Sequence, residues 1–417
     1  ELAKACGEIK NLLAKTHDGS DLHGYIGLGH TRWATHGAPT EANAHPHVSN
    51  DGKFAIVQNG IIENFMELRE MLQAKGFRFH SETDTEVIVH LLDMYYTGDG
   101  NLKDTVLKTL GRLEGSYAIG ILCADCPEQM FLARNGCPLI IGVGAGATEV
   151  GQTHIYSGTS GWVGTVMDHQ AVDLSAMIAG IVGAEKGKYN YFAEMETAGK
   201  CFEWVKDHLV LDEVNIYLSK TDVAESQESV YESLYDYMSD TVAQVAPGSG
   251  GVIFTPWLHG NRCPFEDPAA AGIFFNIQLE TGKAQMLRAV LEGICFHQRW
   301  MLECEERKTK TVPVIRFVGG GALSKVTCQM LADITGRTVE TVENTKDVGA
   351  IGAAMLAAVG SGLFPDLAQA ASHVKVNGRY TPNTALKPVY DRNYRVFRQL
   401  YASNKKNFAL LNKLKEA

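Results

Sequence analysis

The sequence lacks an excess of basic residues, a long apolar run and a secretory leader pattern. Its 417 residues carry 38 Lys and Arg against 48 Asp and Glu, a formal net charge of -10. A nucleic-acid footprint needs a basic stripe, so this balance argues against nucleic-acid binding and against a polybasic membrane contact. No apolar run approaches the ~20 residues that span a bilayer, and no signal peptide is recognisable. These absences predict a cytoplasmic protein without nucleic-acid or membrane partners.

Cysteine is present without any regular spacing. The nine cysteines are scattered and odd in number, as expected for reduced thiols. Cys123-Ala-Asp-Cys126 is a single C-x-x-C with no second pair beside it, whereas structural zinc needs four ligands. We therefore predict no metal site built from protein side chains. The composition, 45% hydrophobic and 21% charged, is that of a globular chain, and the length predicts two to three domains.

Three local patterns organise the first third of the chain. Leu2 to Lys15 has apolar residues at helical spacing and predicts an amphipathic helix. Phe54 to Gln58 predicts a buried strand that stops at the turn dipeptide Asn59-Gly60. Ser81 to Glu86 places several acids before an apolar run, which is typical of a helix N-terminus.

Four of these residues have side chains or backbone groups suited to a free amino acid. The planar fork of Arg32 fits a carboxylate. Asn59 and the backbone N–H of Gly60 could aim two donors at one oxygen, as in an oxyanion hole. Asp84 could accept from an ammonium group. Spacing alone leaves the structural alternative open, because Asn-Gly is commonly a turn and an acid at a helix start is commonly a cap.

The residue identities in this region are more specific than the spacing of its functional groups. It contains Gly29-His-Thr-Arg-Trp-Ala-Thr-His-Gly37, Asn43-Ala-His-Pro-His47, Gln58-Asn-Gly-Ile-Ile-Glu-Asn64 and Ser81-Glu-Thr-Asp-Thr-Glu86. Residues 1 to about 143 thereby resemble the glutaminase domain of glutamine–fructose-6-phosphate aminotransferases, which have an N-terminal-nucleophile hydrolase fold. The resemblance implies an oxyanion hole at Asn59 and Gly60. It implies that glutamine binds to Arg32, Trp33, Thr35, His36 and Asp84.

Two departures from that family are visible. The family nucleophile is a cysteine at the first position of the mature chain, whereas this sequence begins at Glu1. Cys6-Gly7 imitates the family's opening dipeptide, but it falls inside the predicted helix, so we expect Cys6 to be an ordinary helix residue. Nothing downstream resembles the family's sugar isomerase domains. We therefore expect neither glutamine hydrolysis nor transfer of its amino group to a sugar phosphate.

The remaining two thirds contain two glycine-rich turns next to strands. His154 to Ser157 and Trp162 to Met167 predict a hairpin with the tip Gly158-Thr-Ser-Gly161, which could bring backbone N–H and hydroxyl groups to phosphate oxygens. Val314 to Val318 predicts a strand that enters Gly319-Gly-Gly-Ala-Leu-Ser324 and then a helix from Lys325 to Thr335. A purely structural hairpin remains the alternative for the first.

These segments occur in a familiar order with three others. They are Pro256-Trp-Leu-His-Gly-Asn-Arg-Cys-Pro264, Arg288-Ala-Val-Leu-Glu-Gly293 and Gly349-Ala-Ile-Gly-Ala-Ala354. Residues from about 142 to 417 thereby resemble the C-terminal lobe of the FGGY carbohydrate kinases, nearest to xylulokinase-like members. The resemblance implies a ribonuclease-H-like, actin-type ATPase lobe that uses ATP and Mg²⁺. It implies ATP contacts at Gly158, Thr159, Ser160, Gly161, Gly319, Gly320, Gly321, Ala322, Ser324 and Gln329.

The kinase resemblance is also incomplete. The family's other lobe, which supplies most sugar contacts, has no counterpart here. The family's catalytic Asp lies about seven residues before the glycines corresponding to Gly142–Ala145, and counting back reaches Asn135. An amide cannot accept the proton of a sugar hydroxyl, and losing a general base typically costs ~10²–10⁴ in rate. We therefore expect no intact catalytic residue for either chemistry.

Three hypotheses follow for an α/β chain with a glutaminase fragment at 1–143 and a kinase lobe at 144–417. The chain is a carbohydrate kinase acting on a ketose or polyol, a glutamine amidohydrolase, or a non-catalytic chimera that binds nucleotide. We favour kinase family identity combined with an inactive chain. Incomplete sheets predict self-association through exposed edges. Because both families could share Ile141-Gly-Val-Gly-Ala-Gly146, we hypothesise that the two sequences join within it.

Overall fold

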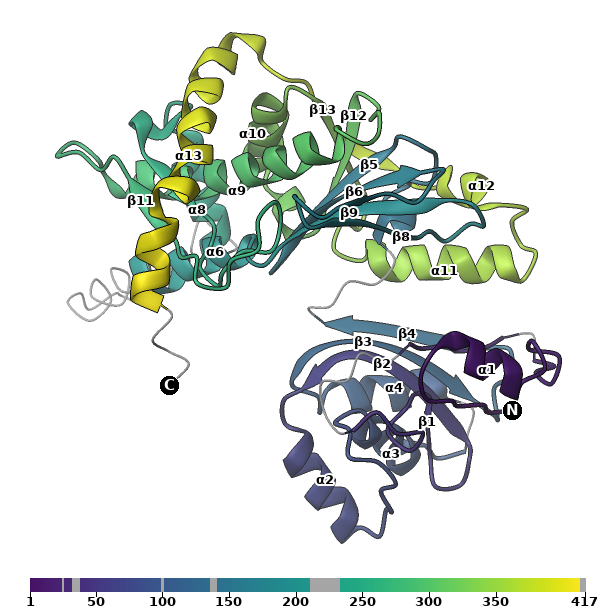
Figure 1. Ribbon diagram of the computed structural model, residues 1–417. Coiled ribbons are helices and arrows are strands. Elements are labelled where there is room, and N and C mark those ends of the chain that lie inside the picture. Colours follow the sequence, from purple (N-terminus) through teal and green to yellow (C-terminus); the bar gives the residue numbers. More distant parts are fainter. Residues whose placement is uncertain (25, 32–37, 99–100, 136–140, 211–232, 413–417) are drawn as a thin grey trace, which may run out of the picture. The chain divides into compact units, whose positions relative to one another are not determined.

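The structure is a computed structural model that describes the chain except residues 25, 32–37, 99–100, 136–140, 211–232 and 413–417. The chain divides into two compact units, Glu1–Leu139 and Ile140–Ala417. Both units combine helices with a sheet, so the expected α/β class is confirmed (Figure 1). Each unit is considered by itself below.

The first unit contains a four-stranded antiparallel sheet in the order β1-β2-β3-β4. Its strands are β1 (His47–Val48), β2 (Phe54–Ile62), β3 (Gly115–Cys123) and β4 (Met130–Asn135). Its helices are α1 (Ile9–Lys15), α2 (Phe65–Ala74), α3 (Glu86–Tyr95) and α4 (Leu102–Leu110). Phe54, Ile56 and Ile62 of β2 are fully buried and share one core with the apolar side chains of α2, α3 and α4.

Two sequence expectations in this unit are wrong. The predicted turn at Asn59-Gly60 is absent, because β2 continues through it and Gly60 pairs with Tyr117 of β3. Gly60 has a φ of 122°, a conformation that glycine alone adopts readily, so the dipeptide marks an irregular strand position here. The predicted helix from Leu2 begins only at Ile9, and Cys6 lies in an exposed bend before it. Gly7, with a φ of 89°, interrupts the helical pattern.

The second unit is built on an eight-stranded sheet in the order β14-β13-β12-β5-β6-β9-β8-β7. Its strands are β5 (Thr153–Ser157), β6 (Gly161–Met167), β7 (Val172–Asp173), β8 (Ile178–Val182), β9 (Tyr189–Met195), β12 (Val314–Val318), β13 (Thr338–Val342) and β14 (Val376–Tyr380). The central strand β12 runs parallel to β5 and to β13, while the other neighbours are antiparallel. A separate hairpin pairs β10 (Ile253–Thr255) with β11 (Ile273–Phe275).

Helices cover this sheet on both faces (Figure 1). They are α5 (Ile141–Gly144), α6 (Gly199–Val205), α8 (Leu234–Ala243), α9 (Lys283–Glu305), α10 (Lys325–Thr335), α11 (Val348–Gly360), α12 (Leu367–Ala371) and α13 (Lys387–Asn412), with short helical turns η1 (Lys206–Val210), η2 (Ser249–Gly251), η3 (Gly320–Leu323) and η4 (Thr384–Leu386). The large core lies under α9, α10 and α13. A smaller core lies on the side of α5 and α11, and it contains Ala145, Tyr156, Trp162, Val318, Val342 and Val348.

A buried ion pair fixes the long helix α9 within the larger core. Arg288 Nε donates to Glu292 Oε1 at 2.8 Å, one turn along the helix. Glu292 also accepts from the backbone N–H of Gly248 and from the Ser249 hydroxyl, both at 2.8 Å. Arg288 donates further to the hydroxyl of Tyr390 on α13. Because both charges are satisfied by several hydrogen bonds, the pair can tie three segments together despite its desolvation.

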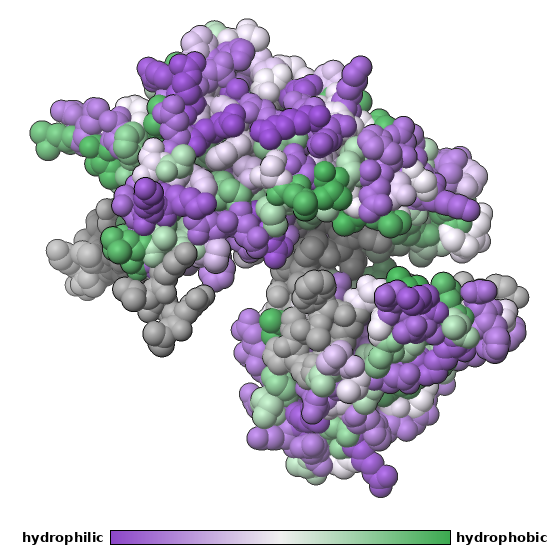
Figure 2. All heavy atoms as spheres, in the orientation of Figure 1, coloured by the Kyte–Doolittle hydropathy of each residue, from purple (hydrophilic) through white to green (hydrophobic). Residues whose placement is uncertain are grey.

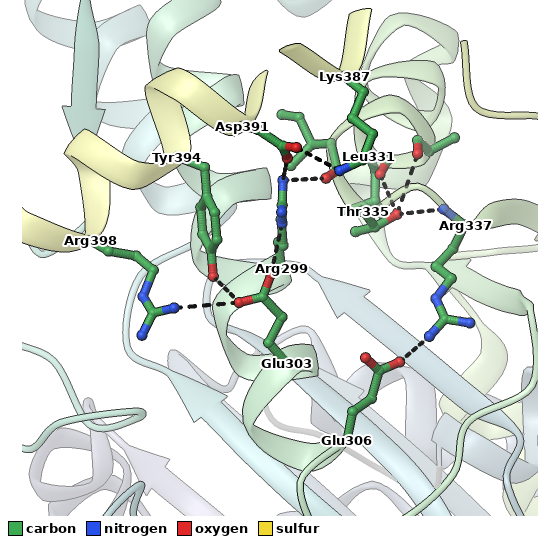
Figure 3. A network of polar contacts seen from close by, with 12 residues as sticks. Arg299, Glu303, Glu306, Leu331, Thr335, Arg337, Lys387, Asp391, Tyr394 and Arg398 are labelled. Atoms are coloured by element: carbon green, nitrogen blue, oxygen red, sulfur yellow. Dashed lines mark hydrogen bonds and ion pairs between the residues drawn. The ribbon is translucent and has the colours of Figure 1, made fainter. Parts of the chain in front are cut away.

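A second polar network ties α13 to α9 and α10 at the surface, as Figure 3 shows. Arg299 donates to Asp391 at 2.7 Å and to Glu303 at 2.9 Å. Glu303 also accepts from the Tyr394 hydroxyl at 2.7 Å, and the guanidinium of Arg299 lies 4.2 Å from the centroid of the Tyr394 ring. The planar guanidinium can stack and donate at the same time, so these contacts orient α13 along α9.

Exposed apolar side chains gather at two places in the second unit. The strands at one edge of the large sheet and their connection carry Val172, Leu174, Met177, Ile181 and Val182. The end of β11 and the tip beyond it carry Phe275, Ile277 and Leu279, and Figure 2 shows hydrophobic residues beside hydrophilic ones on this projection. None of the helices in the described part of the chain is long and apolar enough to cross a membrane.

Candidate functional sites

The two predicted glycine-rich turns meet at one end of the large sheet. β5 and β12 are parallel and adjacent, with Tyr156 opposite Val318, so the turns that follow them emerge at the same edge. Gly319 has a φ of 92°, and a Cβ there would lie 2.7 Å from the carbonyl oxygen of Ser157. A side chain would therefore separate the turns. Ligands of open α/β sheets bind at such carboxyl ends, where loops from adjacent strands converge.

The tip of the β5–β6 hairpin is held by the start of α6. The backbone N–H of Gly199 donates to the Gly158 carbonyl at 2.7 Å. Those of Ala198 and Lys200 donate to the Thr159 carbonyl at 2.9 and 3.2 Å. A Cβ on Gly199 would lie 2.5 Å from the Gly158 oxygen, which explains the glycine at this position. The carbonyl groups of the tip are therefore turned toward α6.

The donors of the same tip are free within the described part of the chain. Neither the backbone N–H nor the hydroxyl of Thr159 or Ser160 has a hydrogen-bond acceptor among the described residues. Thr159 is exposed, and Ser160 is half-buried. A loop whose carbonyls are occupied and whose N–H groups are free presents partial positive charge, which suits an anion.

The second turn is more heavily committed to structure. The Ser324 hydroxyl accepts from the backbone N–H of Thr327 at 3.3 Å and caps α10. Gln329 donates from Nε2 to Asp333 and to the Thr381 carbonyl, both at 2.8 Å, and so uses both amide hydrogens. Ala322 is buried, whereas a Cβ on Gly320 would meet nothing within 4 Å. The strand, turn and helix are confirmed at the predicted residues, while nucleotide contacts here remain predictions.

The glycine stretch that precedes β5 forms the short helix α5 and packs against α11. A Cβ on Gly144 would lie 1.7 Å from the Val348 carbonyl oxygen, so the two backbones touch. Gly142 lies against the ring of buried His154, since a Cβ there would be 3.0 Å from the ring. The alternation of glycine thus serves close packing within the second unit. Asn135, the position assigned to the kinase base, ends β4 of the first unit.

The candidate glutamine site is described only in part. Arg32, Trp33, Thr35 and His36 lie outside the described residues. Asp84 is buried just before α3, and its Oδ2 accepts from the backbone N–H of Ile62 at 2.8 Å. His30 Nε2 donates to Asn59 Oδ1 at 2.8 Å, since that oxygen can only accept. The Asn59 amide hydrogens then remain available for a developing oxyanion, as the proposed oxyanion hole requires.

The buried carboxylate of Glu86 organises this region. The sequence pattern predicted it only as an acid at the start of a helix. Glu86 accepts from the backbone N–H groups of His80 and Ser81, both at 2.7 Å, and from the Ser81 hydroxyl at 2.6 Å. Burial acts to raise the pKa of Glu86, but the His90 imidazole 3.5 Å away and the hydrogen bonds from Ser81 and His80 outweigh it and lower the pKa to about 2. Glu86 therefore stays charged and fixes the turn that presents Asp84. The five-residue spacing from Ser81 to Glu86 is the sequence feature from which this hydrogen bond could have been predicted.

Two histidines of the Asn43-to-His47 segment support the end of β2. His45 Nδ1 accepts from the backbone N–H of Gln58 at 3.1 Å, and the Thr85 hydroxyl donates to Gln58 Oε1 at 2.7 Å. His47 Nε2 contacts the Thr83 hydroxyl at 3.1 Å. These contacts connect β2 to the residues before α3. Among the described residues, no group of three or more His, Cys, Asp or Glu side chains could hold a metal ion.

In the loop from Pro256 to Pro268, the charged side chain of Arg262 forms ion pairs. Its guanidinium pairs with Glu194 at the end of β9 and lies 3.2 Å from Glu196. The Arg262 side chain remains about half exposed. The Thr197 hydroxyl donates to the Pro256 carbonyl at 2.6 Å, which anchors the start of the loop. The loop is therefore tied to the segment that leads from β9 into α6.

Comparison with known families assigns the two parts separately. The model of the glutamine amidotransferase domain family matches residues 8–142. The model of the C-terminal domain of the FGGY family of carbohydrate kinases matches residues 154–361. The two parts of the chain are thus similar to two different enzyme families. The first part matches a glutamine amidotransferase domain and the second matches the C-terminal domain of FGGY carbohydrate kinases, which are the two resemblances that the sequence motifs predicted.

Relatives of the first part are glutamine–fructose-6-phosphate aminotransferases (isomerizing). The protein from Clostridium perfringens is 51% identical over 138 residues, which are 33% of this chain and 22% of that protein. The protein from Caldanaerobacter subterraneus is 48% identical over 145 residues, 35% of this chain and 23% of that protein. The protein from Pyrococcus horikoshii is 50% identical over 145 residues, with 35% and 24% covered. The chain therefore spans less than a quarter of the length of each of these relatives.

Solved structures similar to this chain are sugar kinases. The xylulose kinase of Lactobacillus acidophilus superimposes with a TM-score of 0.56 at 24% identity, covering 65% of this chain and 51% of that one. A gluconate kinase from the same organism gives 0.54 at 24% identity, covering 64% and 50%. The xylulose kinase of Rhodospirillum rubrum gives 0.54 at 23% identity, again covering 64% and 50%. These similarities establish the kinase fold, and the chain spans about half the length of each.

Proposed function

We propose that the second unit is an ATP-binding lobe of ribonuclease-H-like, actin-type fold. The hairpin tip supports this most directly, because the start of α6 binds the Gly158 and Thr159 carbonyls, while the N–H and hydroxyl groups of Thr159 and Ser160 have no acceptor among the described residues. Phosphoryl oxygens accept several hydrogen bonds at once, so a triphosphate fits this set of donors. Gly158, Gly161 and the turn from Gly319 to Ser324, with Gln329, would complete the nucleotide contacts.

Mg²⁺ is expected to accompany the triphosphate. Mg²⁺ keeps several waters and is commonly held by one or two carboxylates together with substrate phosphates. Such binding needs no cage of protein ligands, so the hairpin tip, whose residues include no carboxylate, would meet Mg²⁺ through the phosphates. The metal would neutralise phosphate charge, while the side chains and backbone of the tip orient the phosphates.

A binding experiment tests this assignment. Calorimetric titration of the 417-residue chain with ATP and Mg²⁺ should show binding at one site. The double variant Thr159→Ala, Ser160→Ala should bind about a hundredfold more weakly or worse, since it removes two hydroxyls and hydrogen bonds to charged groups are typically worth about 1.5–3 kcal/mol each. Ser361→Ala is a matched control, because that exposed hydroxyl bonds only within the end of α11. Absence of ATP binding by the unsubstituted chain would refute the proposal.

We further propose that the 417-residue chain does not turn over sugar by itself. The general-base position falls on Asn135, whose amide cannot accept a proton. A coupled assay with ATP, Mg²⁺ and xylulose or gluconate should give no ADP release above the rate without sugar. Asn135→Asp is the informative variant, because it restores the carboxylate alone. Sustained sugar phosphorylation by the unsubstituted chain would show that this proposal is wrong.

The second candidate is a glutamine site in the first unit, a partial N-terminal-nucleophile hydrolase of residues 1–143 preceding a kinase lobe of 144–417. The observation that favours it is the Asn59 amide beside Gly60, whose hydrogens have no acceptor among the described residues, with buried Asp84 bonded to Ile62 on the same strand β2. Hydrolysis is not expected from Cys6, since its nitrogen is in a peptide bond and cannot serve as an N-terminal amine base. Release of glutamate from glutamine, abolished by Cys6→Ala, would contradict that expectation.

A further inference from the structure

Tyr156 lies between the two glycine-rich turns. A Cβ on Gly158 would be 2.1 Å from the Tyr156 hydroxyl oxygen, and a Cβ on Gly319 would be 2.9 Å from Cε2 of the same ring. The ring therefore fills the space that both glycines leave, with its hydroxyl against the first residue of the hairpin tip. Tyr156 is 6% exposed. Sequence reasoning did not single it out, because a tyrosine on a buried strand is usually a core residue.

The orientation of the Tyr156 ring is fixed by its neighbours. It stacks on Trp162 of β6, with ring centroids 4.1 Å apart and planes 19° from parallel. The Trp162 indole N–H donates to His154 Nε2 at 3.2 Å. Burial lowers the pKa of His154 to about 4, so its imidazole is neutral near pH 7 and can accept this hydrogen bond. The three aromatic side chains are thus locked together beneath the turns.

The hydroxyl at the end of this stack has no structural task. No hydrogen bond to it is formed within the described part of the chain, and its oxygen is not among the fully buried polar atoms there that lack a partner. The adjacent tip contributes the free N–H and hydroxyl groups of Thr159 and Ser160. A group that can satisfy all of these must accept several hydrogen bonds at neighbouring atoms. Phosphoryl oxygens do so, whereas a sugar hydroxyl or an apolar group does not.

We infer that the Tyr156 hydroxyl donates a hydrogen bond to a phosphoryl oxygen of the bound nucleotide and so selects for the phosphate chain. This inference rests on the proposed ATP site. Because the hydroxyl is held by stacking before the ligand arrives, its donation requires no reordering of the side chain. The Tyr156 hydroxyl therefore contributes to binding of the phosphates, and other residues recognise the adenosine.

The test compares three ligands on the unsubstituted chain and on Tyr156→Phe, each in the presence of Mg²⁺. Removing the hydroxyl should weaken ATP and inorganic tripolyphosphate about tenfold or more, while adenosine binding should change less than about twofold. Tyr191→Phe is a matched control, since that buried tyrosine of β9 also has an unpartnered hydroxyl but does not adjoin the hairpin tip. Its ATP affinity should equal that of the unsubstituted chain.

A second variant keeps the inference testable if Tyr156→Phe does not fold. Gly158→Ala places a Cβ where the hydroxyl now lies and should produce the same selective loss of phosphate affinity. Gly360→Ala is its control, because that glycine ends α11 and a Cβ there meets nothing within 4 Å. If the unsubstituted chain binds ATP and both site variants bind it equally well, the inference is wrong and the ATP site stands. Equal losses for ATP and adenosine would also overturn it, and an unsubstituted chain that binds no ATP would remove both proposals.

Discussion

Glu305 is the residue at which burial and charge conflict most directly. It ends α9 with no solvent exposure, and its Oε2 accepts from the Thr165 hydroxyl at 2.6 Å. Thr165 in turn lies 2.8 Å from the Thr153 hydroxyl. Its other carboxyl oxygen has no partner in the described ranges. Burial raises the pKa of Glu305 to about 8, so the group is mostly protonated near neutral pH.

This residue predicts a pH dependence of stability with a definite sign. Between the ordinary pKa of 4.5 and the raised value of about 8, the folded state binds a proton that the unfolded state has lost. Unfolding free energy should therefore fall as pH rises through this window, by at most about 1.4 kcal/mol per pH unit. Glu305→Gln should flatten the curve and stabilise the protein above pH 8, as measured by urea unfolding at pH 5.5, 7 and 8.5.

The control for this experiment is a carboxylate that stays in water. Glu280 is exposed, so Glu280→Gln should leave the pH dependence of unfolding unchanged. Parallel stability curves for Glu305→Gln and the unsubstituted protein would mean that the Glu305 carboxyl does not carry the effect.

At the scale of elements, the crossing of α5 and α11 depends on absent side chains. The Gly144 position leaves no room for a methyl group, since a Cβ would lie 1.7 Å from the Val348 oxygen and 2.7 Å from the Gly352 nitrogen. Both obstacles are backbone atoms, which cannot rotate away as a side chain can. The contact therefore tolerates only glycine without separation of the helices.

Gly144→Ala should destabilise the second unit by about 3 kcal/mol or more, at or above the upper end of typical overpacking costs. Chemical unfolding followed by tryptophan fluorescence measures this loss, because four of the five tryptophans, Trp33 excepted, belong to that unit. Gly320→Ala, where a Cβ meets nothing, should stay within about 0.5 kcal/mol. Equal stability of the two variants would contradict the predicted clash.

The elements also show what sequence patterns could and could not provide. The strand, glycine turn and helix from Val314 to Thr335 were predictable, since apolar strand, flexible turn and capped helix are each encoded locally. The continuation of β2 through Asn59-Gly60 was not, because pairing with β3 overrides the turn preference of the dipeptide. The insertion of β12 between β5 and β13 joins segments distant in sequence, and no local signal specifies it.

The candidate sites divide in the same way. The hairpin residues Thr159 and Ser160 could be recognised from their glycine-rich context. Tyr156 could not be recognised from the sequence. Its place between the two turns depends on contact with Gly319, and the parallel pairing of β5 and β12 creates that contact. The family resemblance implies a nucleotide contact at Ser324, and its hydroxyl oxygen also caps α10; the nucleotide contact stays a prediction. Local patterns find donors, while the tertiary fold determines which donors remain free.

At the scale of the whole molecule, the hydrophobic cores are separate. One core draws all its residues from Glu1–Leu139, and the other two draw theirs from Ile140–Ala417. Separate cores predict two unfolding transitions by differential scanning calorimetry. ATP with Mg²⁺ at 100 times its dissociation constant should stabilise only the second unit, by about 2.7 kcal/mol. A single transition that shifts as a whole would contradict independent unfolding.

The edge of the large sheet predicts association between copies of the chain. β8 carries Ile181, 52% exposed, and Val182, 78% exposed, beside the very short edge strand β7. Exposed apolar edges favour pairing with another chain. Sedimentation velocity should show concentration-dependent oligomers that Ile181→Lys diminishes. Leu279→Lys, at the tip beyond β11, is the control; if it alone dissociates the oligomers, the sheet edge is not the interface.

The grip of α6 on the hairpin also has a consequence in time. The amide protons of Ala198, Gly199 and Lys200 are held by the carbonyls of Gly158 and Thr159. Such protons exchange with deuterated solvent only when the hydrogen bonds open. Their exchange rates therefore report how often the hairpin tip separates from α6. A ligand that binds at the tip and slows this exchange would thereby be shown to restrain the hairpin, without any substitution in the chain.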